Sequence, residues 1–215
     1  MTKMSTSNKG LFISFEGIDG CGKSTQVQLL MDKLEKDGVI AMLVREPGGS
    51  TISEEIRNIL LKTRSDTMSA RAEALLMTAS RAQLTKDTIL PALDEGTCVI
   101  ADRYQDSTLA YQGGGRGLDV DYLIQLNIFA TYSLDPDLTF YIDISSDEGL
   151  KRSGTLNPDR IESAGLKFQE KVRRQYLKLA QMWPNRFVII DGTDSIKGIH
   201  GTIWEKTINC LNDTP

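Results

Sequence analysis

Short segments that are apolar throughout alternate along the chain with segments whose apolar residues recur at helical spacing. Five segments of the first kind predict strands within residues 11–17, 39–49, 97–104, 138–145 and 186–192. Segments of the second kind predict helices over residues 24–38, 52–62, 69–90, 120–132, 166–183 and 196–211, and Pro91 is expected to end the third. Strands that are apolar throughout and alternate with helices are typical of a parallel sheet covered on both faces. The pattern therefore predicts an α/β fold with a parallel sheet of about five strands and helices on both faces.

The same pattern bears on how the chain is organised. Residues 1–10 are polar and lack the apolar core of a secretory signal, so we expect a disordered tail there. Residues 11–215 contain no internal repeat and no linker-like segment, which predicts a single domain. Doubly wound sheets bind ligands beyond the carboxyl ends of their strands, so the polar residues that follow each strand are the candidates for function.

Composition narrows the range of partners. The formal net charge is −4, which argues against a nucleic-acid partner. No apolar run approaches the ~20 residues that cross a bilayer, so no membrane partner is expected. Cys21, Cys98 and Cys210 form neither a CxxC pair nor a metal-ligand spacing, which favours reduced thiols. We therefore expect a cytoplasmic protein.

A glycine-rich segment between the first predicted strand and the first predicted helix fits the pattern G-x-x-x-x-G-K-[ST]. Its glycines let successive N–H groups converge on an anion, and the helix N-terminus adds a favourable dipole. Lys23 can reach the β- and γ-phosphates of a nucleotide, while the Ser24 hydroxyl can hold Mg²⁺. The expected ATP-binding residues are Gly17, Ile18, Asp19, Gly20, Cys21, Gly22, Lys23, Ser24 and Thr25.

A phosphate-binding loop also occurs in GTPases, motor ATPases and switches. The sequence has no NKxD-like segment to read guanine, and motors normally need a longer chain. The segments that follow the other strands favour a kinase with a small acceptor: REPGG at 45–49, DRY at 102–104, AYQG at 110–113 and DRIE at 159–162. Taken alone, the Asp-Arg pair also fits a surface ion pair, and the charged stretch before DRIE also fits a solvated loop.

Together with SRAQL at 80–84, these segments make residues 11–211 resemble thymidylate kinases. REPGG and DRY…AYQG separate this family from adenylate, guanylate and shikimate kinases. The resemblance implies the P-loop NTPase fold and in-line phosphoryl transfer from ATP to dTMP, which yields dTDP for dTTP synthesis. It also implies Mg²⁺, and a homodimer for which the apolar helix at 72–90 is a candidate interface. A kinase with another acceptor and a nucleotide-dependent switch remain the alternatives.

The resemblance also assigns the acceptor site. It places the acceptor phosphate on Arg103 and Arg57, whose planar guanidinium groups suit a phosphate; Arg57 also fits an exposed helix residue. Arg81 would donate to thymine O4, a position where cytosine carries an amino group. Met77 stands where the family commonly has a phenylalanine on the base, and its sulfur can still pack on a ring. The expected acceptor-binding residues are Glu46, Arg57, Met77, Arg81, Arg103, Thr108, Tyr111 and Gln112.

The resemblance further implies how the sugar and the moving phosphoryl group are held. Tyr111 would exclude a 2′-hydroxyl, and Asp19 would lie near the acceptor's 3′-hydroxyl and phosphate, although Asp19 also fits a turn-former. The variable positions of the phosphate loop carry no basic residue, which matches the bacterial type with arginine in a lid. We expect that lid at about residues 149–163, as an irregular loop whose closure excludes water. The expected lid arginines are Arg152 and Arg160, the catalytic residues Lys23, Arg152, Asp19 and Arg103, and the metal-binding residues Ser24, Asp102 and Glu46.

Overall fold

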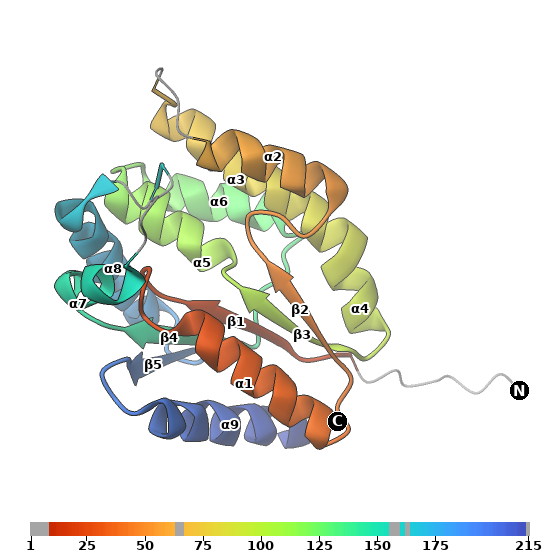
Figure 1. Ribbon diagram of the computed structural model, residues 1–215. Helices are drawn as coiled ribbons and strands as arrows, with labels where there is room; N and C mark the ends of the chain where they lie inside the picture. Colours follow the sequence, from red (N-terminus) through yellow and green to blue (C-terminus); the bar gives the residue numbers. More distant parts are fainter. Residues whose placement is uncertain (1–8, 63–66, 155–159, 162–163, 214–215) are drawn as a thin grey trace, which may run out of the picture.

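The computed structural model describes residues 9–62, 67–154, 160–161 and 164–213. Its centre is one sheet of five parallel strands in the order β2-β3-β1-β4-β5 (Figure 1). The strands are β1 (Phe12–Glu16), β2 (Ala41–Arg45), β3 (Cys98–Asp102), β4 (Leu138–Asp143) and β5 (Phe187–Asp191). The predicted α/β fold with a five-stranded parallel sheet is therefore confirmed.

The middle strand of the sheet sets the position of the phosphate-binding segment. All five residues of β1 are buried, because β3 and β4 flank it and helices cover both faces of the sheet. Figure 1 shows α1 (Lys23–Lys36) and α9 (Ile196–Asp213) on one side of the sheet. On the other side lie α2 (Thr51–Leu61), α3 (Ala70–Leu84) and α6 (Val120–Ala130). The segment after β1 therefore emerges at the centre of the sheet's carboxyl edge.

The helix that contains Pro91 does not end there as predicted. After α3 the chain continues through a π-helical segment, η1 (Thr85–Ile89), into α4 (Leu90–Asp94). The N–H of Leu90 donates to the carbonyl of Thr85, so the wide turn is closed just before the proline. Pro91 occupies the first turn of α4, where a missing N–H and a fixed φ angle are tolerated. Pro91 therefore starts a helical segment here.

Two helical regions were not predicted. After β3, α5 (Gln105–Thr108) runs into the π-helical η2 (Leu109–Gly115). After β4, where the pattern predicts a charged loop, residues form α7 (Ser146–Ser153). Ser145 caps α7 by accepting from the N–H of Glu148, and Gly154 ends it in a left-handed conformation with φ 49°. The first part of the predicted lid is thus helical. Its residues 155–159 and 162–163, and residues 1–8 of the predicted tail, lie outside the described residues.

The other helices begin and end within two residues of their predicted bounds, including α8 (Leu166–Met182). Over the described parts of the chain, none of these helices is both long enough and apolar enough to cross a membrane.

Candidate active site

The phosphate-binding loop turns sharply between β1 and α1. Gly17, Gly20 and Gly22 all have positive φ angles, a conformation that costs glycine little. Lys23 is 7% exposed, and its Nζ donates to the carbonyl oxygens of Gly17 at 3.0 Å and of Ile18 at 3.2 Å. The loop therefore holds the charge of Lys23 against its own backbone, at the N-terminus of α1. A lysine charge beside a helix N-terminus suits the binding of a phosphate group.

The same loop packs directly on α7. A Cβ atom on Gly20 would lie 2.2 Å from the carbonyl oxygen of Gly149, and one on Gly149 would lie 2.7 Å from that of Asp19. Arg152, in the last turn of α7, contacts Glu148 and the segment after β5. Its Nε donates to Glu148 at 2.7 Å and its Nη1 to the carbonyl of Gly192 at 2.7 Å. The predicted lid arginine thus sits on a helix that touches the phosphate loop, with its guanidinium group held by Glu148 and Gly192.

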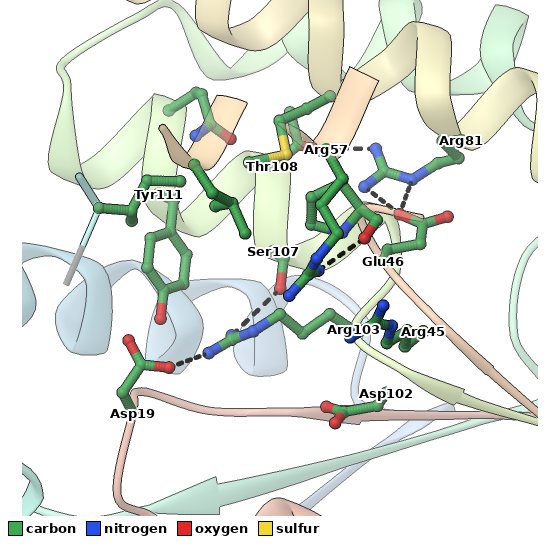
Figure 2. Close-up of a pocket in the computed structure, with 15 residues that line it drawn as sticks. Asp19, Arg45, Glu46, Arg57, Arg81, Asp102, Arg103, Ser107, Thr108 and Tyr111 are labelled. Atoms are coloured by element: carbon green, nitrogen blue, oxygen red, sulfur yellow. Dashed lines mark hydrogen bonds and ion pairs between the residues drawn. The ribbon is translucent and has the colours of Figure 1, made fainter. Parts of the chain in front are cut away.

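A pocket of about 240 Å³ opens beside this loop, beyond the carboxyl ends of β2 and β3. Figure 2 shows Arg81 and Glu46 at one end of it and Asp19 and Tyr111 at the other, with Arg103 reaching toward Asp19. All eight residues predicted to bind the acceptor line this pocket, and so do Asp19 and Asp102. The structure therefore brings the predicted acceptor residues together from the positions directly after β2 and β3 and from α2, α3, α5 and η2.

Arg103 lies between the loop and the pocket. Its backbone is left-handed, with φ 71°, a strained conformation for a non-glycine residue. Its Nη1 donates to the carbonyl of Gly17 at 2.8 Å, and its Nη2 lies 2.6 Å from Oδ1 of Asp19. Burial alone would raise the pKa of Asp19, but the charges of Arg103 and Lys23 outweigh it and leave that pKa lowered. Both members of this pair are therefore charged at neutral pH.

Tyr111 completes this end of the pocket. Its ring lies 5.0 Å from the Arg103 guanidinium carbon, a cation–π distance. Its hydroxyl is buried and has no hydrogen-bond partner within the described residues. A buried hydroxyl that faces a polar pocket without a partner is a site where a ligand can supply the missing hydrogen bond.

Arg81 is almost completely buried, and most of its donors are used within the protein. Its Nε donates to Oε2 of Glu46 at 2.7 Å, and its Nη2 also lies 2.6 Å from the same oxygen. Its remaining donors reach Thr108 at 2.9 Å, Asn127 at 2.8 Å and the carbonyl of Tyr104 at 3.1 Å. Four of its five N–H groups thus donate to acceptors in the protein, and Nη2, which carries the fifth, is ion-paired with Glu46. Direct donation to thymine O4 would require Arg81 to exchange one of these bonds.

Two carboxylate oxygens near the strand ends lack partners in the described chain. They are Oε1 of Glu46 and Oδ1 of Asp102, both buried. The N–H of Glu46 donates to the carbonyl of Asp102 at 3.0 Å, so the two residues are neighbours across β2 and β3. Burial raises the pKa of Glu46, and Arg81 opposes the rise. Unpartnered carboxylate oxygens fit Mg²⁺, which usually takes one or two carboxylates and completes its shell with water and substrate phosphates.

The described residues contain no cluster of three or more histidine, cysteine or acidic side chains that could hold a metal by itself. Ser24, the third predicted metal residue, is exposed in the first turn of α1, next to Thr25, and does not line the acceptor pocket. Nucleotide phosphates would therefore supply many of the ligands of a metal ion at this site.

Arg160 does not face the phosphate loop. Its Nη1 lies 2.5 Å from Oε2 of Glu73, and its Nε donates to the carbonyl of Leu60 at 2.9 Å. Glu73 is 1% exposed, and it also accepts from Arg116 at 3.1 Å and from Gln112 at 2.8 Å. This end of the predicted lid is thus bound to α2 and α3, over the acceptor pocket.

Sequence reasoning missed several residues of this region. Asn127 is a buried polar residue on a helix face whose other buried residues are apolar, and that position is the signal that would have found it. Glu73 shares the buried face of α3 with other polar residues, so its position carries no such signal. Ser107 lies between two recognised segments, DRY and AYQG, and it lines the pocket. Glu16 precedes the phosphate loop and is completely buried. For Ile161, which lines the pocket from the lid, the sequence carries no comparable signal.

Comparison of the sequence with known proteins identifies the family of this chain. The family model described as thymidylate kinase matches residues 15–203. A thymidylate kinase of Fervidobacterium nodosum is 50% identical over 193 residues, covering 90% of this chain and 96% of the relative. Those of Thermoanaerobacter sp. and Halothermothrix orenii are 46% and 44% identical, covering 91% and 94% of this chain and 96% and 99% of their own. The chain belongs to the thymidylate kinase family, as its sequence segments predict.

Proposed function

We propose that this chain moves the γ-phosphoryl group of ATP directly onto the phosphate of dTMP, with the acceptor phosphate held by Arg103. The ATP-dependent formation of dTDP from dTMP is the activity of the family to which the chain belongs. The observation that carries the assignment is the position of Arg103, which contacts both Gly17 of the phosphate loop and Asp19 beside the acceptor pocket. A phosphate bound there lies next to the phosphates of ATP, as direct transfer requires.

On the donor side, the proposed cradle for the ATP phosphates is the backbone of residues 17–25, with Lys23 as the loop cation. ATP as the donor follows from the family. Mg²⁺, held by Ser24, Asp102 and Glu46 together with the phosphates, would neutralise charge on the transferring group. The unpartnered oxygens of Glu46 and Asp102 support these two residues as its protein ligands, direct or through water.

On the acceptor side, Arg57 is the proposed second phosphate residue. It is half-buried, and its Nη1 donates to the carbonyl of Pro47 at 2.7 Å, which keeps its guanidinium group at the pocket wall. Tyr111 lines the pocket at the same end as Asp19, which supports its assignment to the deoxyribose (Figure 2). Thymine would occupy the end of the pocket bounded by Met77, Arg81, Thr108 and Gln112.

The roles of Arg81 and Thr108 in reading the base are linked. Nη1 of Arg81 donates to the Thr108 hydroxyl at 2.9 Å. Rotation of that hydroxyl away from Arg81 would release one guanidinium donor for thymine O4. We propose that the base is read through this exchange, because the remaining bonds of Arg81 fix its position.

Arg152 is the proposed catalytic arginine. Its ion pair with Glu148 joins side chains that are 37% and 36% exposed, and exposed pairs of this kind contribute only about 0–1 kcal/mol. The guanidinium group can therefore leave Glu148 at small cost, and it also gives up the carbonyl of Gly192 when it turns toward the phosphates as the lid closes. Arg160, which is bound to Glu73, would instead hold the lid over the acceptor.

We also propose that the chain acts as a homodimer in the cytoplasm. Leu75 on α3 and Tyr122 and Phe129 on α6 are 56%, 72% and 84% exposed. A hollow of about 800 Å³ lies between these two helices. Large exposed apolar side chains around a hollow are typical of an interface between subunits. Sedimentation of the wild type and of Phe129→Glu tests this point, and a wild type that sediments as a monomer would exclude it.

The central test measures ADP release with dTMP, dUMP, dCMP, dGMP and dAMP in parallel. The proposal expects dTMP to be the best acceptor and Arg103→Ala to raise the KM for dTMP by about 10²-fold, while the KM for ATP changes little. ADP release that no acceptor stimulates would favour a nucleotide-dependent switch. Equal turnover of dTMP and dCMP would remove the assignment of Arg81 to the base.

A further inference from the structure

A group of buried polar side chains lies beneath the acceptor pocket and is used by none of the steps above. At its centre is Glu16, the last residue of β1, which is completely buried. Its Oε1 accepts from the N–H of Tyr104 at 2.8 Å. Its Oε2 lies 2.6 Å from the Ser107 hydroxyl and 2.7 Å from the Tyr176 hydroxyl. Glu16 thereby joins β1 to the segment after β3 and to α8.

These contacts lead directly to Arg103. The N–H of Arg103 donates to the carbonyl of Phe15 at 3.0 Å, and the next N–H along the chain, that of Tyr104, donates to Glu16. The left-handed backbone of Arg103 is therefore held on both sides by consecutive residues of β1. In addition, Nη1 of Arg103 donates to Ser107 at 3.4 Å, and Ser107 contacts Glu16.

The contacts of Oε2 of Glu16 indicate whether the carboxyl group carries a proton. The Ser107 and Tyr176 hydroxyls lie 2.9 Å apart, so three oxygens form a triangle with all three sides at hydrogen-bonding distance. With Glu16 ionised, two hydroxyl protons serve three contacts, and one contact has no proton. With Glu16 protonated, each oxygen donates once and accepts once. The geometry thus accommodates a protonated carboxyl, whose other oxygen still accepts from Tyr104.

We propose that Glu16 is a positioning residue for acceptor binding, which holds Arg103 toward the acceptor phosphate and does so best when it carries a proton. The inference rests on the proposed function, in which Arg103 binds that phosphate. An ionised Glu16 would add a negative charge beneath the site, whereas a neutral Glu16 keeps the same contacts without it.

The charged surroundings of Glu16 support this state. Burial raises the pKa of Glu16 to about 7, and the negative charge of Asp106 adds to the rise. The hydrogen bonds from Ser107 and Tyr176 and the charge of Arg103 act in the opposite direction. Arg186, which is paired with Asp106 at 2.6 Å, is a further cation that interacts with Glu16.

The direction of the pH effect follows from linkage. A dianionic phosphate on Arg103 favours the neutral form of Glu16, so the affinity for dTMP falls as the pH rises through the pKa of Glu16. The phosphate of dTMP itself also titrates, at about pH 6. Because that titration affects every variant equally, the ratio of KM values between wild type and variant isolates the contribution of Glu16.

The test measures kcat and both KM values from pH 6 to pH 9 for the wild type and for Glu16→Gln, an amide that mimics the neutral acid. At pH 6 the KM for dTMP of Glu16→Gln is expected to match that of the wild type. By pH 9 the wild-type KM should exceed that of the variant by about fivefold, at the low end of site-to-site coupling. A ratio that stays constant across this range would overturn the role of the proton.

Glu16→Asp tests the positioning role, because the shorter side chain cannot reach Tyr104 and Ser107 together. The KM for dTMP should rise on the order of tenfold while the KM for ATP is unchanged. Asp106→Asn is the matched control. It removes the neighbouring buried carboxylate but keeps the contacts of Glu16, so its KM for dTMP at pH 6 should stay within about twofold of the wild type.

The outcomes separate this inference from the function on which it rests. A KM rise for Asp106→Asn equal to that of Glu16→Asp would mean that any lost buried carboxylate causes the effect, and an equal rise in the KM for ATP would mean general damage to the phosphate loop. Either result overturns the positioning role. If Arg103→Ala leaves the KM for dTMP unchanged, the acceptor assignment itself fails. If Arg103→Ala raises it and Glu16→Asp does not, only the inference about Glu16 fails.

Discussion

Replacing Arg81 by methionine tests whether this arginine is first of all part of the fold. The side chain is 2% exposed and lines the pocket. That group donates to Glu46, Thr108, Asn127 and the carbonyl of Tyr104. Methionine keeps an unbranched apolar side chain in this space but supplies none of these bonds. Glu46, 4% exposed at its side chain, is left buried without its cation.

The expected loss follows from these contacts. Removing one partner of a buried ion pair costs about 3–5 kcal/mol, and we expect a loss of about 4 kcal/mol in the free energy of unfolding at pH 7. Burial raises the folded-state pKa of Glu46 above its usual 4.5, and without Arg81 to oppose burial the pKa rises further. The folded variant then holds its proton more tightly than the unfolded chain does. The part of the penalty that comes from the Glu46 charge is therefore small below about pH 4.5 and grows as the pH rises toward 7.

Urea unfolding at pH 5 and pH 7 measures both the size and the sign of this effect. Arg57→Met is the matched control, because Arg57 lines the same pocket but is only half-buried, and its loss should stay near 1 kcal/mol. Adding Glu46→Gln to Arg81→Met should recover at least about 1 kcal/mol, since no buried charge remains. A loss below about 1 kcal/mol for Arg81→Met, or an equal loss at both pH values, would refute the reasoning.

Three further outcomes follow from other contacts. Arg152→Ala should lower kcat by about 10²-fold with little change in ATP binding, by comparison with other catalytic arginines; Lys151→Ala on the same helix is the control, and a wild-type kcat would exclude Arg152 from catalysis. Glu73→Gln removes the charge that two arginines share, so the free energy of unfolding in urea should fall by about 2–3 kcal/mol, and a loss below about 1 kcal/mol would contradict this. Gly20→Ala puts its Cβ 2.2 Å from a carbonyl of α7, while Gly22→Ala meets nothing within 4 Å. Gly20→Ala should therefore lower the free energy of unfolding by about 2 kcal/mol more than Gly22→Ala does. Equal melting temperatures would show that α7 moves away from the loop without loss of stability.

The parts of the fold that sequence reasoning reached are those governed by local pattern. β1 and β4 both lie between two other strands in the sheet. Their residues are therefore largely buried, and this burial appears in the sequence as short runs of apolar residues. The phosphate-binding loop is visible for a related reason, because its glycines and its lysine are needed at fixed spacing. Once the strand order is known, the residues after β2 and β3 must meet, which is why the predicted acceptor residues line one pocket.

The parts that it missed depend on contacts between distant segments. The π-helical turns that carry Tyr111 and precede Pro91 have no propensity signature, since the spacing of apolar residues barely differs from that of an α-helix. The partners of Arg160 are another case. Glu73 lies 87 positions away, and no local rule separates a lid arginine that faces ATP from one that pairs with α3. For Arg81 the residue was found, but its four hydrogen bonds within the protein were not foreseeable from its helix.

The charges that line the acceptor pocket indicate how much further positive charge the acceptor phosphate needs. Four arginines and three carboxylates line it, an excess of one positive charge. Three of the arginines are already paired, Arg81 with Glu46, Arg103 with Asp19 and Arg45 with Glu54 outside the pocket lining. A dianionic monophosphate therefore exceeds the positive charge that the pocket provides, and the difference has to come from a metal ion, from the lid or from a proton. Glu16 lies two hydrogen bonds from Arg103, beneath the site and away from solvent, so it can take up that proton without giving up its contacts. Proton uptake on dTMP binding should then persist without ATP and Mg²⁺, because it depends on the acceptor phosphate alone.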